Sequence, residues 1–260
     1  MQQIDFGKTA ADYRRHRAGF PEAYFARVAQ YGVGIKTQDL LDLGTGTGTL
    51  ARGFARRGCR VTGLDPSAPM VAQARRIDEE EGIRVDYLEA RAEESGLPDA
   101  LFDVITAGQC WHWFERDATA REARRMLRAN GALVISHLDW LPAAGNVVAA
   151  SEALIRCHNP QWNLGDGKGI YPQWFSDLME AGFVGIESFS FDVDLPYSHE
   201  DWRGRLRASA GIAASLAPEA VERFDGELAA MLAAEFPEPM LAVPHRVFTV
   251  LGRKPGAPPA

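Results

Sequence analysis

The chain has 260 residues, which is enough for one α/β domain with a sizeable core. Its apolar content of 46% and its charged content of 24% are typical of soluble globular proteins, and no apolar run reaches the length of a membrane span. The formal charge of −7 argues against a nucleic-acid partner, because phosphate binding requires a basic surface.

Apolar segments alternate with helical segments along the first half of the chain. The apolar runs predict strands, and the segments between them have the opening prolines and closing glycines of helices. The predicted strands are 38–43, 60–64, 83–88, 102–107 and 132–137, and the predicted helices are 21–31, 48–57, 66–81 and 116–129. Strands that alternate with helices of about 10 to 15 residues indicate a parallel, doubly wound sheet.

The second half of the chain has a less regular pattern. The elements expected there are helices at 145–158, 172–182 and 199–235, the last with a break at 217–218, and strands at 184–195 and 246–251. We expect one domain over residues 1–253, with a helical cap from about 1–31, 140–170 and 198–244. The tail 254–260 is expected to be disordered.

The cysteines Cys59, Cys110 and Cys157 bear on the compartment and on metal binding. Their spacing fits no metal motif, and their odd number argues against a disulfide framework. The start of the chain also lacks the apolar segment of a signal peptide. We therefore expect a cytoplasmic protein without a metal site or a membrane partner.

A glycine-rich turn separates the first two predicted strands. The first strand ends in Asp42, the glycines Gly44, Gly46 and Gly48 follow, and the second strand ends in Asp65. Glycines let a ligand approach the backbone closely, and an acid about 20 residues further on accepts hydrogen bonds from ribose hydroxyls. The stretch is typical of a site for a nucleoside-containing cofactor. A glycine-rich turn without a ligand is the alternative.

The spacing of the glycines distinguishes between kinds of cofactor. A dinucleotide fingerprint reads G-x-G-x-x-G. Counted from Gly44, its last position is Thr49, and the match also fails from Gly46. The remaining pattern, Asp-x-Gly-x-Gly-x-Gly, resembles the first motif of the class I S-adenosylmethionine-dependent methyltransferases.

Other segments resemble small-molecule methyltransferases of the same class, above all the group typified by the ubiquinone-biosynthesis and trans-aconitate methyltransferases. These segments are Phe6–Pro21, Phe102–Ile105, Trp111–Trp113 and Arg125–Gly131. The resemblance implies a Rossmann-like sheet of seven strands in the order 3-2-1-4-5-7-6, with strand 7 antiparallel. It also implies methyl transfer from S-adenosylmethionine to the O, N or C atom of a small molecule, with S-adenosylhomocysteine as the product.

The resemblance assigns roles around the cofactor. The glycine turn (residues 44–48) would pass the methionine part, Asp42 would hold its ammonium group, and Asp65 would accept both ribose hydroxyls. The alternatives are a turn cap for Asp42 and a helix cap for Asp65. Tyr13 and Arg17 would hold the cofactor carboxylate, where a solvated basic segment is the alternative.

Adenine would lie against residues 89–93. The backbone N–H of Ala92 would meet a ring nitrogen, and Glu93 would accept from the exocyclic amine. Arg91 stands where many relatives carry Asp, so the side-chain contact departs from the family pattern. For Glu93 the alternative is a solvated residue at the start of a helix.

Gln109 and the aromatic residues after it belong to the acceptor side of the predicted site. Gln109 would bond the cofactor or the substrate, and His112 is the candidate catalytic base because an ordinary histidine pKa lies near neutrality. A structural histidine is the alternative. The candidates for contact with the acceptor are Trp111, Trp113, His137, Trp140 and His245.

Two other functions remain open at this point. One is a protein that binds S-adenosylmethionine without catalysing a reaction. The other is a nicotinamide-dependent oxidoreductase, against which the broken glycine fingerprint argues.

Overall fold

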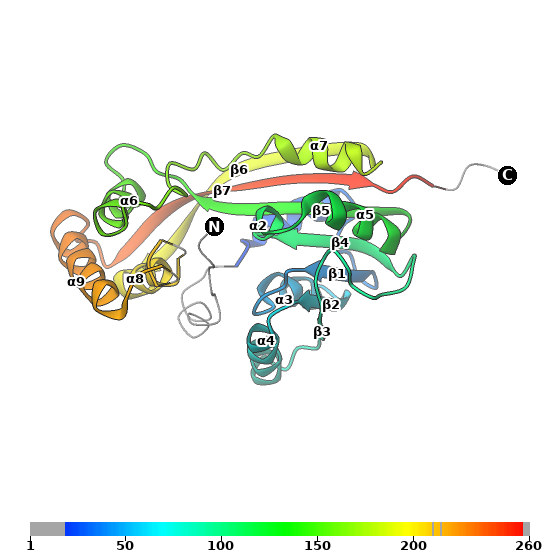
Figure 1. Ribbon diagram of the computed structural model, residues 1–260, viewed down its shortest axis with the longest axis horizontal. Coiled ribbons are helices and arrows are strands. Elements are labelled where there is room, and N and C mark those ends of the chain that lie inside the picture. Colours follow the sequence, from blue (N-terminus) through cyan, green and yellow to red (C-terminus); the bar gives the residue numbers. More distant parts are fainter. Residues whose placement is uncertain (1–18, 210, 214, 257–260) are drawn as a thin grey trace. The chain divides into compact units, whose positions relative to one another are not determined.

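The computed structural model describes residues 19–209, 211–213 and 215–256. This part of the chain contains a seven-stranded sheet in the order β3-β2-β1-β4-β5-β7-β6 (Figure 1). Strands β1 to β5 pair in parallel, and β7 is antiparallel. The predicted fold class and strand order are therefore confirmed. The strands are β1 (Asp39–Leu43), β2 (Arg60–Asp65), β3 (Asp86–Glu89), β4 (Phe102–Gly108), β5 (Leu127–Trp140), β6 (Val184–Ser198) and β7 (Met240–Arg253).

Helices and one 3-10 turn connect the strands. They are α2 (Glu22–Gln30), α3 (Thr49–Ala55), α4 (Ala68–Glu81), η2 (Trp111–Trp113), α5 (Arg116–Met126), α6 (Val147–His158), α7 (Gln173–Glu180), α8 (His199–Arg207) and α9 (Pro218–Glu235). Their ends have local causes. Pro69 lies in the first turn of α4, and Gly82 ends this helix with a φ of 64°. None of the described helices is long and apolar enough to cross a membrane.

One predicted boundary is wrong at the start of β5. The sequence predicts a helix over 116–129, but α5 ends at Met126 and the strand starts at Leu127. Leu127 pairs with Phe102 of β4. Pairing with the sheet therefore overrides the helical composition of the last predicted turn.

The last strand is longer than predicted. The sequence predicts a strand at 246–251, but β7 begins at Met240 and includes Pro244. The Pro244 carbonyl accepts a hydrogen bond of 2.8 Å from the Leu141 N–H, so this residue still contributes an acceptor to the sheet. The helical segment predicted over 199–235 consists of two helices, and the predicted break at 217–218 coincides with the start of α9 at Pro218.

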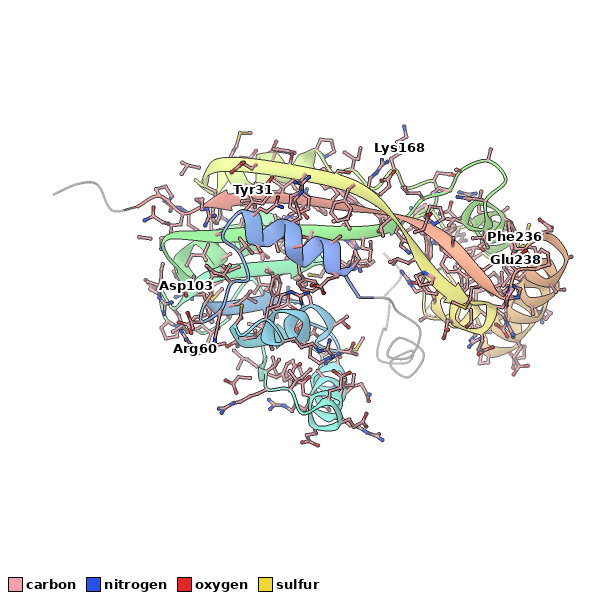
Figure 2. The ribbon with its side chains drawn as sticks, turned by 180° about the vertical axis from the view of Figure 1, so that it is seen from behind. Tyr31, Arg60, Asp103, Lys168, Phe236 and Glu238 are labelled. Atoms are coloured by element: carbon pink, nitrogen blue, oxygen red, sulfur yellow. The ribbon has the colours of Figure 1, made fainter. Side chains whose placement is uncertain are left out.

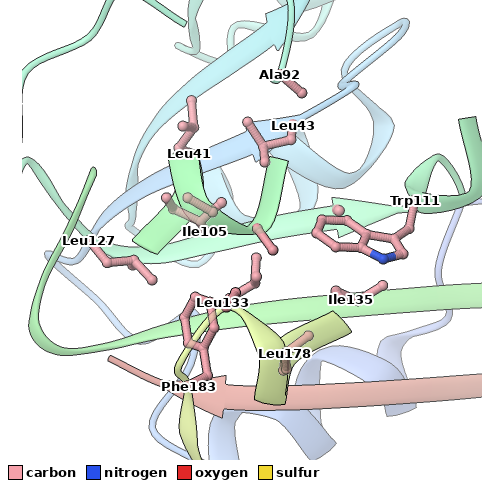
Figure 3. Close-up of a cluster of buried hydrophobic side chains, with 14 of the residues drawn as sticks. Leu41, Leu43, Ala92, Ile105, Trp111, Leu127, Leu133, Ile135, Leu178 and Phe183 are labelled. Carbon is pink, nitrogen blue, oxygen red and sulfur yellow. The ribbon is translucent and has the colours of Figure 1, made fainter. Parts of the chain in front are cut away.

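The two faces of the sheet carry separate layers of helices. Alternate residues of β1, such as Leu41 and Leu43, join a core that α5 and α7 complete through Met126 and Leu178 (Figure 3). On the other face, Phe25 of α2 meets Phe54 of α3 with ring centres 5.1 Å apart. A period of two along the strands thus separates the two layers.

Charged residues join the strands at their amino-terminal ends (Figure 2). Arg60 lies 2.6 Å from Asp39, and Arg128 lies within 2.9 Å of both Asp39 and Asp103. These pairs are partly solvent-exposed, so each contributes little to stability. They cover the sheet edge opposite the carboxyl ends, where ligands bind in open α/β sheets.

The described chain divides into two compact units. We call residues 19–138, 171–190 and 247–256 the sheet unit, and residues 139–170 and 191–246 the helical unit. Strands β5, β6 and β7 continue from one unit into the other. The helical unit has a core of its own around Trp202, Phe224 and Leu228. The predicted single domain with its cap stays a prediction.

Candidate functional site

The glycine turn adopts a backbone that favours glycine. Gly44, Gly46 and Gly48 have φ values of 60°, 55° and 79°. A Cβ atom on Gly44 would lie 2.9 Å from Phe114, and one on Gly48 would collide with the Tyr87 hydroxyl. For a Cβ atom on Gly46, no atom of the described residues would lie within 4 Å. Packing therefore requires two of these glycines, whereas Gly46 borders open space.

Asp65 connects the glycine turn to the start of α4. Its Oδ2 accepts a hydrogen bond of 2.8 Å from the Gly46 N–H, and its Oδ1 accepts one of 2.9 Å from the Ser67 N–H. Burial raises the pKa of this carboxyl, and the two N–H groups oppose the rise. Each oxygen keeps capacity for a further hydrogen bond. The contact with Ser67 fits the helix-start alternative, and the ribose role stays a prediction.

Asp42 is a second buried carboxyl group at the carboxyl end of β1. It is 2% exposed, and its Oδ1 accepts a hydrogen bond of 2.8 Å from Thr106 Oγ1. Burial raises its pKa to about 6, against the effect of this hydrogen bond. No lysine or arginine of the described chain forms an ion pair with Asp42 or Asp65. An uncompensated buried carboxylate is costly, so a cationic ligand group would fit beside Asp42.

A strained turn follows β4. Gln109 has a φ of 62°, which is uncommon for a residue with a side chain, and its N–H donates to Ser136 of β5. Cys110 Sγ lies 3.1 Å from the carbonyl oxygen of Leu43. The turn is thus fixed between β1 and β5. Backbone strain of this kind often accompanies functional sites.

The structure brings together two histidines that are far apart in the sequence. The ring centres of His112 and His137 are 5.2 Å apart. Trp113 lies 4.5 Å from His112, and Tyr171 lies 5.0 Å from His137. Trp113 is 46% exposed, whereas His137 is buried. Three of the predicted acceptor-side residues therefore form one aromatic group in the sheet unit.

Trp111 and its partner Asp177 are arranged differently from the prediction. The Trp111 side chain is fully buried in the core, and its Nε1 donates a hydrogen bond of 2.8 Å to Asp177 Oδ2 on α7. Arg116 Nη1 donates to the same oxygen over 3.1 Å. Asp177 thus fixes the turn that carries His112. The sequence gives no local signal for this role, because a carboxylate on an amphipathic helix is ordinarily solvated.

The residues predicted to contact adenine are in the sheet unit. Ala92 is buried. Glu93 Oε1 accepts a hydrogen bond of 3.1 Å from the Glu115 N–H, and Arg91 forms an ion pair of 3.3 Å with Glu93. Glu93 therefore has a structural task at the start of α5. Its contact with adenine stays a prediction.

The remaining predicted residues lie elsewhere. Trp140 and His245 are in the helical unit. His245 is 3% exposed, burial lowers its pKa to about 4, and its Nδ1 contacts the Val243 carbonyl. Tyr13 and Arg17 lie outside the described residues. Within those residues, no group of three or more His, Cys, Asp or Glu side chains has the geometry of a metal site.

S-adenosylmethionine fits the groups of the sheet unit. The cofactor contains an ammonium group, two ribose hydroxyls and an adenine ring. The open space at Gly46 and the two buried carboxyl groups Asp42 and Asp65 provide room, charge and acceptors for such a molecule. The residues that would hold it are therefore the glycine turn, Asp42 and Asp65.

Comparison with known proteins connects this arrangement to a family. Residues 41–135 match a family model described as a methyltransferase domain. Ubiquinone biosynthesis O-methyltransferase from Azorhizobium caulinodans is 33% identical over 106 residues, which are 40% of this chain and 42% of that protein. The chain spans about half the length of the curated relatives it matches.

Two solved structures have the same fold. A putative type II methyltransferase from Anaeromyxobacter dehalogenans has a TM-score of 0.65 at 24% identity, over 93% of this chain and 99% of that chain. The second is phosphoethanolamine N-methyltransferase 2 from Haemonchus contortus, in complex with phosphomonomethylethanolamine and S-adenosylhomocysteine. It has a TM-score of 0.59 at 20% identity, over 97% of this chain and 60% of that chain.

Proposed function

We propose that this chain, whose residues 41–135 match a methyltransferase domain, is a class I methyltransferase. It would transfer a methyl group from S-adenosylmethionine to a small-molecule acceptor. The family resemblance predicted from the sequence is confirmed. The acceptor, and the choice among its O, N and C atoms, belong to the proposal. The Haemonchus contortus enzyme, which was solved with S-adenosylhomocysteine and a small phosphorylated amine, supports it.

The observation that carries the proposal is the contrast within the glycine turn. Gly44 and Gly48 are required by side chains of this chain, but Gly46 borders open space. The Gly46 N–H is held by Asp65, whose oxygens keep capacity for two ribose hydroxyls. This space lies beside a backbone N–H that one of two buried carboxyl groups holds, which supports a ligand at the turn.

The residues of the chain would act mainly by binding and orientation. When bound, S-adenosylmethionine supplies a methyl group that is already activated on a sulfonium. The protein must hold the acceptor in line with it, which contributes several kcal/mol, about 7–11 in well-oriented cases. We propose that Trp113 and His137 line the acceptor side. His112 would accept a proton where the acceptor must lose one.

The test is an assay for S-adenosylhomocysteine release. The full chain is incubated with S-adenosylmethionine and a panel of small phenols, amines and carboxylates. We expect release with at least one acceptor and a loss of rate in His112→Ala, with unchanged affinity for S-adenosylhomocysteine. His158→Ala is the matched control, because His158 lies in the helical unit and pairs with Glu227.

Other outcomes favour the alternatives. Binding of S-adenosylmethionine without release across the whole panel would indicate a non-catalytic binding protein. Stronger thermal stabilisation by a nicotinamide dinucleotide than by S-adenosylhomocysteine would indicate an oxidoreductase. Equal turnover in His112→Ala and wild type would assign His112 a structural role.

A further inference from the structure

Arg205, on α8, is a half-buried arginine that forms no ion pair with a carboxylate of the described residues. Its guanidinium carbon lies 4.9 Å from the centre of the Trp140 ring. Within the described chain, the ion pairs of α8 are formed by Arg203 and Arg207, and none includes Arg205. A guanidinium that is partly withdrawn from water without an anion is costly. The position of the Arg205 guanidinium therefore suggests a role in binding an anion.

Other arginines of the helical unit differ in this respect. Arg207 Nη1, for example, lies 2.6 Å from Asp225 Oδ1. The arginines of this unit that form such pairs are Arg156, Arg203, Arg207 and Arg246. Ion pairing is thus common among the described arginines of this unit, and only the exposed Arg223 and the half-buried Arg205 form no such pair there.

The ring beneath Arg205 is held rigidly. Trp140 Nε1 donates a hydrogen bond of 2.8 Å to Glu152 Oε1. The Trp140 ring meets Trp202 edge-on, with ring centres 5.6 Å apart. Both contacts fix the indole plane, so Arg205 is presented over a wall that is already in place. A guanidinium over an aromatic ring can still donate N–H bonds from its edge to a planar anion.

Arg205 carries a positive charge, because the guanidinium of arginine stays protonated in proteins. Burial lowers its pKa, and the nearby Tyr197 and Asp139 act in the opposite direction. His245 stacks on Tyr197 with ring centres 6.0 Å apart. Because burial lowers the pKa of His245 to about 4, this ring is neutral near pH 7. Arg205 is therefore the local positive charge.

We propose that Arg205 and the Trp140 ring form a binding site for an organic carboxylate with a flat, apolar body. The guanidinium would hold the carboxylate through two parallel N–H···O bonds, which is the geometry that arginine favours. The indole and neighbouring aromatic rings would contact the apolar body. This inference concerns the helical unit alone and does not depend on methyl transfer.

The probe is 4-fluorobenzoate, with the neutral 4-fluorobenzamide as its matched analogue. Their binding to the full chain is followed by fluorine NMR in the absence of S-adenosylmethionine. We expect the carboxylate to bind wild type at least tenfold more tightly than the amide, a difference of about 1.4 kcal/mol. Arg205→Gln should remove this preference, and Arg205→Lys should keep part of it. Arg223→Gln, on an exposed arginine of α9, is the control and should keep all of it.

The proposal is overturned if wild type binds the two probes equally or binds neither. It is also overturned if Arg205→Gln keeps the tenfold preference. Should Arg205→Gln fail to fold, Arg205→Lys decides, because a full preference in that variant contradicts two-point binding. Since no methyl donor is present, a negative result here leaves the proposed methyl transfer standing, and the converse also holds.

Discussion

The glycine turn of the sheet unit and helix α8 of the helical unit differ in the sign of the buried charge that lacks an ion-pair partner in the described chain. Asp42 and Asp65 are buried carboxyl groups that accept from a hydroxyl and from backbone N–H groups, with no cation paired to them in the described chain. On α8, Arg203 and Arg207 are neutralised by Asp225, and Arg205 is left without an anion. Within the described chain, the first region has buried carboxyl groups without a paired cation, and the second has one arginine without a paired anion.

This difference teaches where to look for ligands. Charges that a protein buries for its own stability are paired within the chain, because unpaired buried charge is costly. Buried charges that lack such a pair indicate the sign of the missing group. Asp42 then favours a cation, such as the ammonium group of S-adenosylmethionine, and Arg205 favours a carboxylate. The predictions below test both regions, with the largest effects in the first.

The largest effect is expected at the centre of the glycine turn. In Gly46→Val, the side chain would fill the open space where a ligand must pass. The affinity for S-adenosylhomocysteine should therefore fall by more than about a hundredfold. The left-handed backbone adds strain of at least about 1–2 kcal/mol. Calorimetry and thermal unfolding of the variant measure the two effects.

Gly48→Val is the comparison variant, because its side chain would collide with the protein itself and not with a bound ligand. Its Cβ would collide with the Tyr87 hydroxyl and lie 2.8 Å from Arg52 Nη1, so this variant should be the less stable of the two. A folded Gly46→Val protein with normal affinity would refute the placement of the ligand.

The next effect is at the ribose acceptor. Asp65→Ala removes a carboxylate that holds the Gly46 N–H and is predicted to accept two ribose hydroxyls. Two charge-assisted hydrogen bonds contribute about 3 kcal/mol, so affinity for S-adenosylhomocysteine should fall roughly a hundredfold. Asp86→Ala is the control, because Asp86 is an exposed carboxylate on neighbouring β3. Unchanged calorimetric affinity in Asp65→Ala would remove this residue from the ribose site.

A smaller effect is expected from pH. The pKa of Asp42 is raised by burial to about 6. Because this folded value lies above the usual one, the folded chain binds the proton more strongly, and the stability that protonation gives is lost as pH rises from about 4 to about 6. Binding has the opposite sign, since the carboxylate is the form that holds an ammonium group. Affinity for S-adenosylhomocysteine should therefore fall about tenfold between pH 7.5 and pH 5.

Asp42→Asn tests whether this titration belongs to Asp42. The variant should bind more weakly at pH 7.5 and show little further change down to pH 5. Histidines also titrate in this range, so the difference between the two proteins is the informative quantity. The assignment fails if wild type and variant have the same pH dependence.

The smallest effect is expected at Asp177. Asp177→Ala removes the acceptor of the Trp111 Nε1–H and of Arg116, which should lower the free energy of unfolding by about 1 kcal/mol. The turn that carries His112 would loosen, so methyl transfer should slow while cofactor affinity is kept. Asp117→Ala is the control, because Asp117 forms an exposed pair on α5. Equal loss of affinity and turnover would contradict a positioning role.

The same comparison explains how far the sequence could be interpreted. The elements from Asp39 to Asp65 were predictable because each has a local cause: glycines where φ is positive, and acids at strand ends. The strand order followed from the family resemblance. The start of β5 at Leu127 was not predictable, because pairing with a distant strand decides it.

The side-chain partners in the candidate sites could not be predicted either, because they are also far apart in the sequence. Asp177 acts on Trp111 across 66 residues, and nothing in the sequence near either residue indicates the other. Arg205 and Trp140 are brought together only by the packing of the helical unit. Local backbone requirements can be recognised in one sequence, whereas contacts between distant side chains require the fold.

The most direct test of the central claim is a calorimetric titration of the wild-type chain with S-adenosylhomocysteine and, separately, with a nicotinamide dinucleotide. We predict one site for S-adenosylhomocysteine with a micromolar dissociation constant, equivalent to about 8 kcal/mol, and much weaker binding of the dinucleotide. Absence of S-adenosylhomocysteine binding at millimolar concentration, or tighter binding of the dinucleotide, would contradict the assignment of the glycine turn and Asp65 to S-adenosylmethionine.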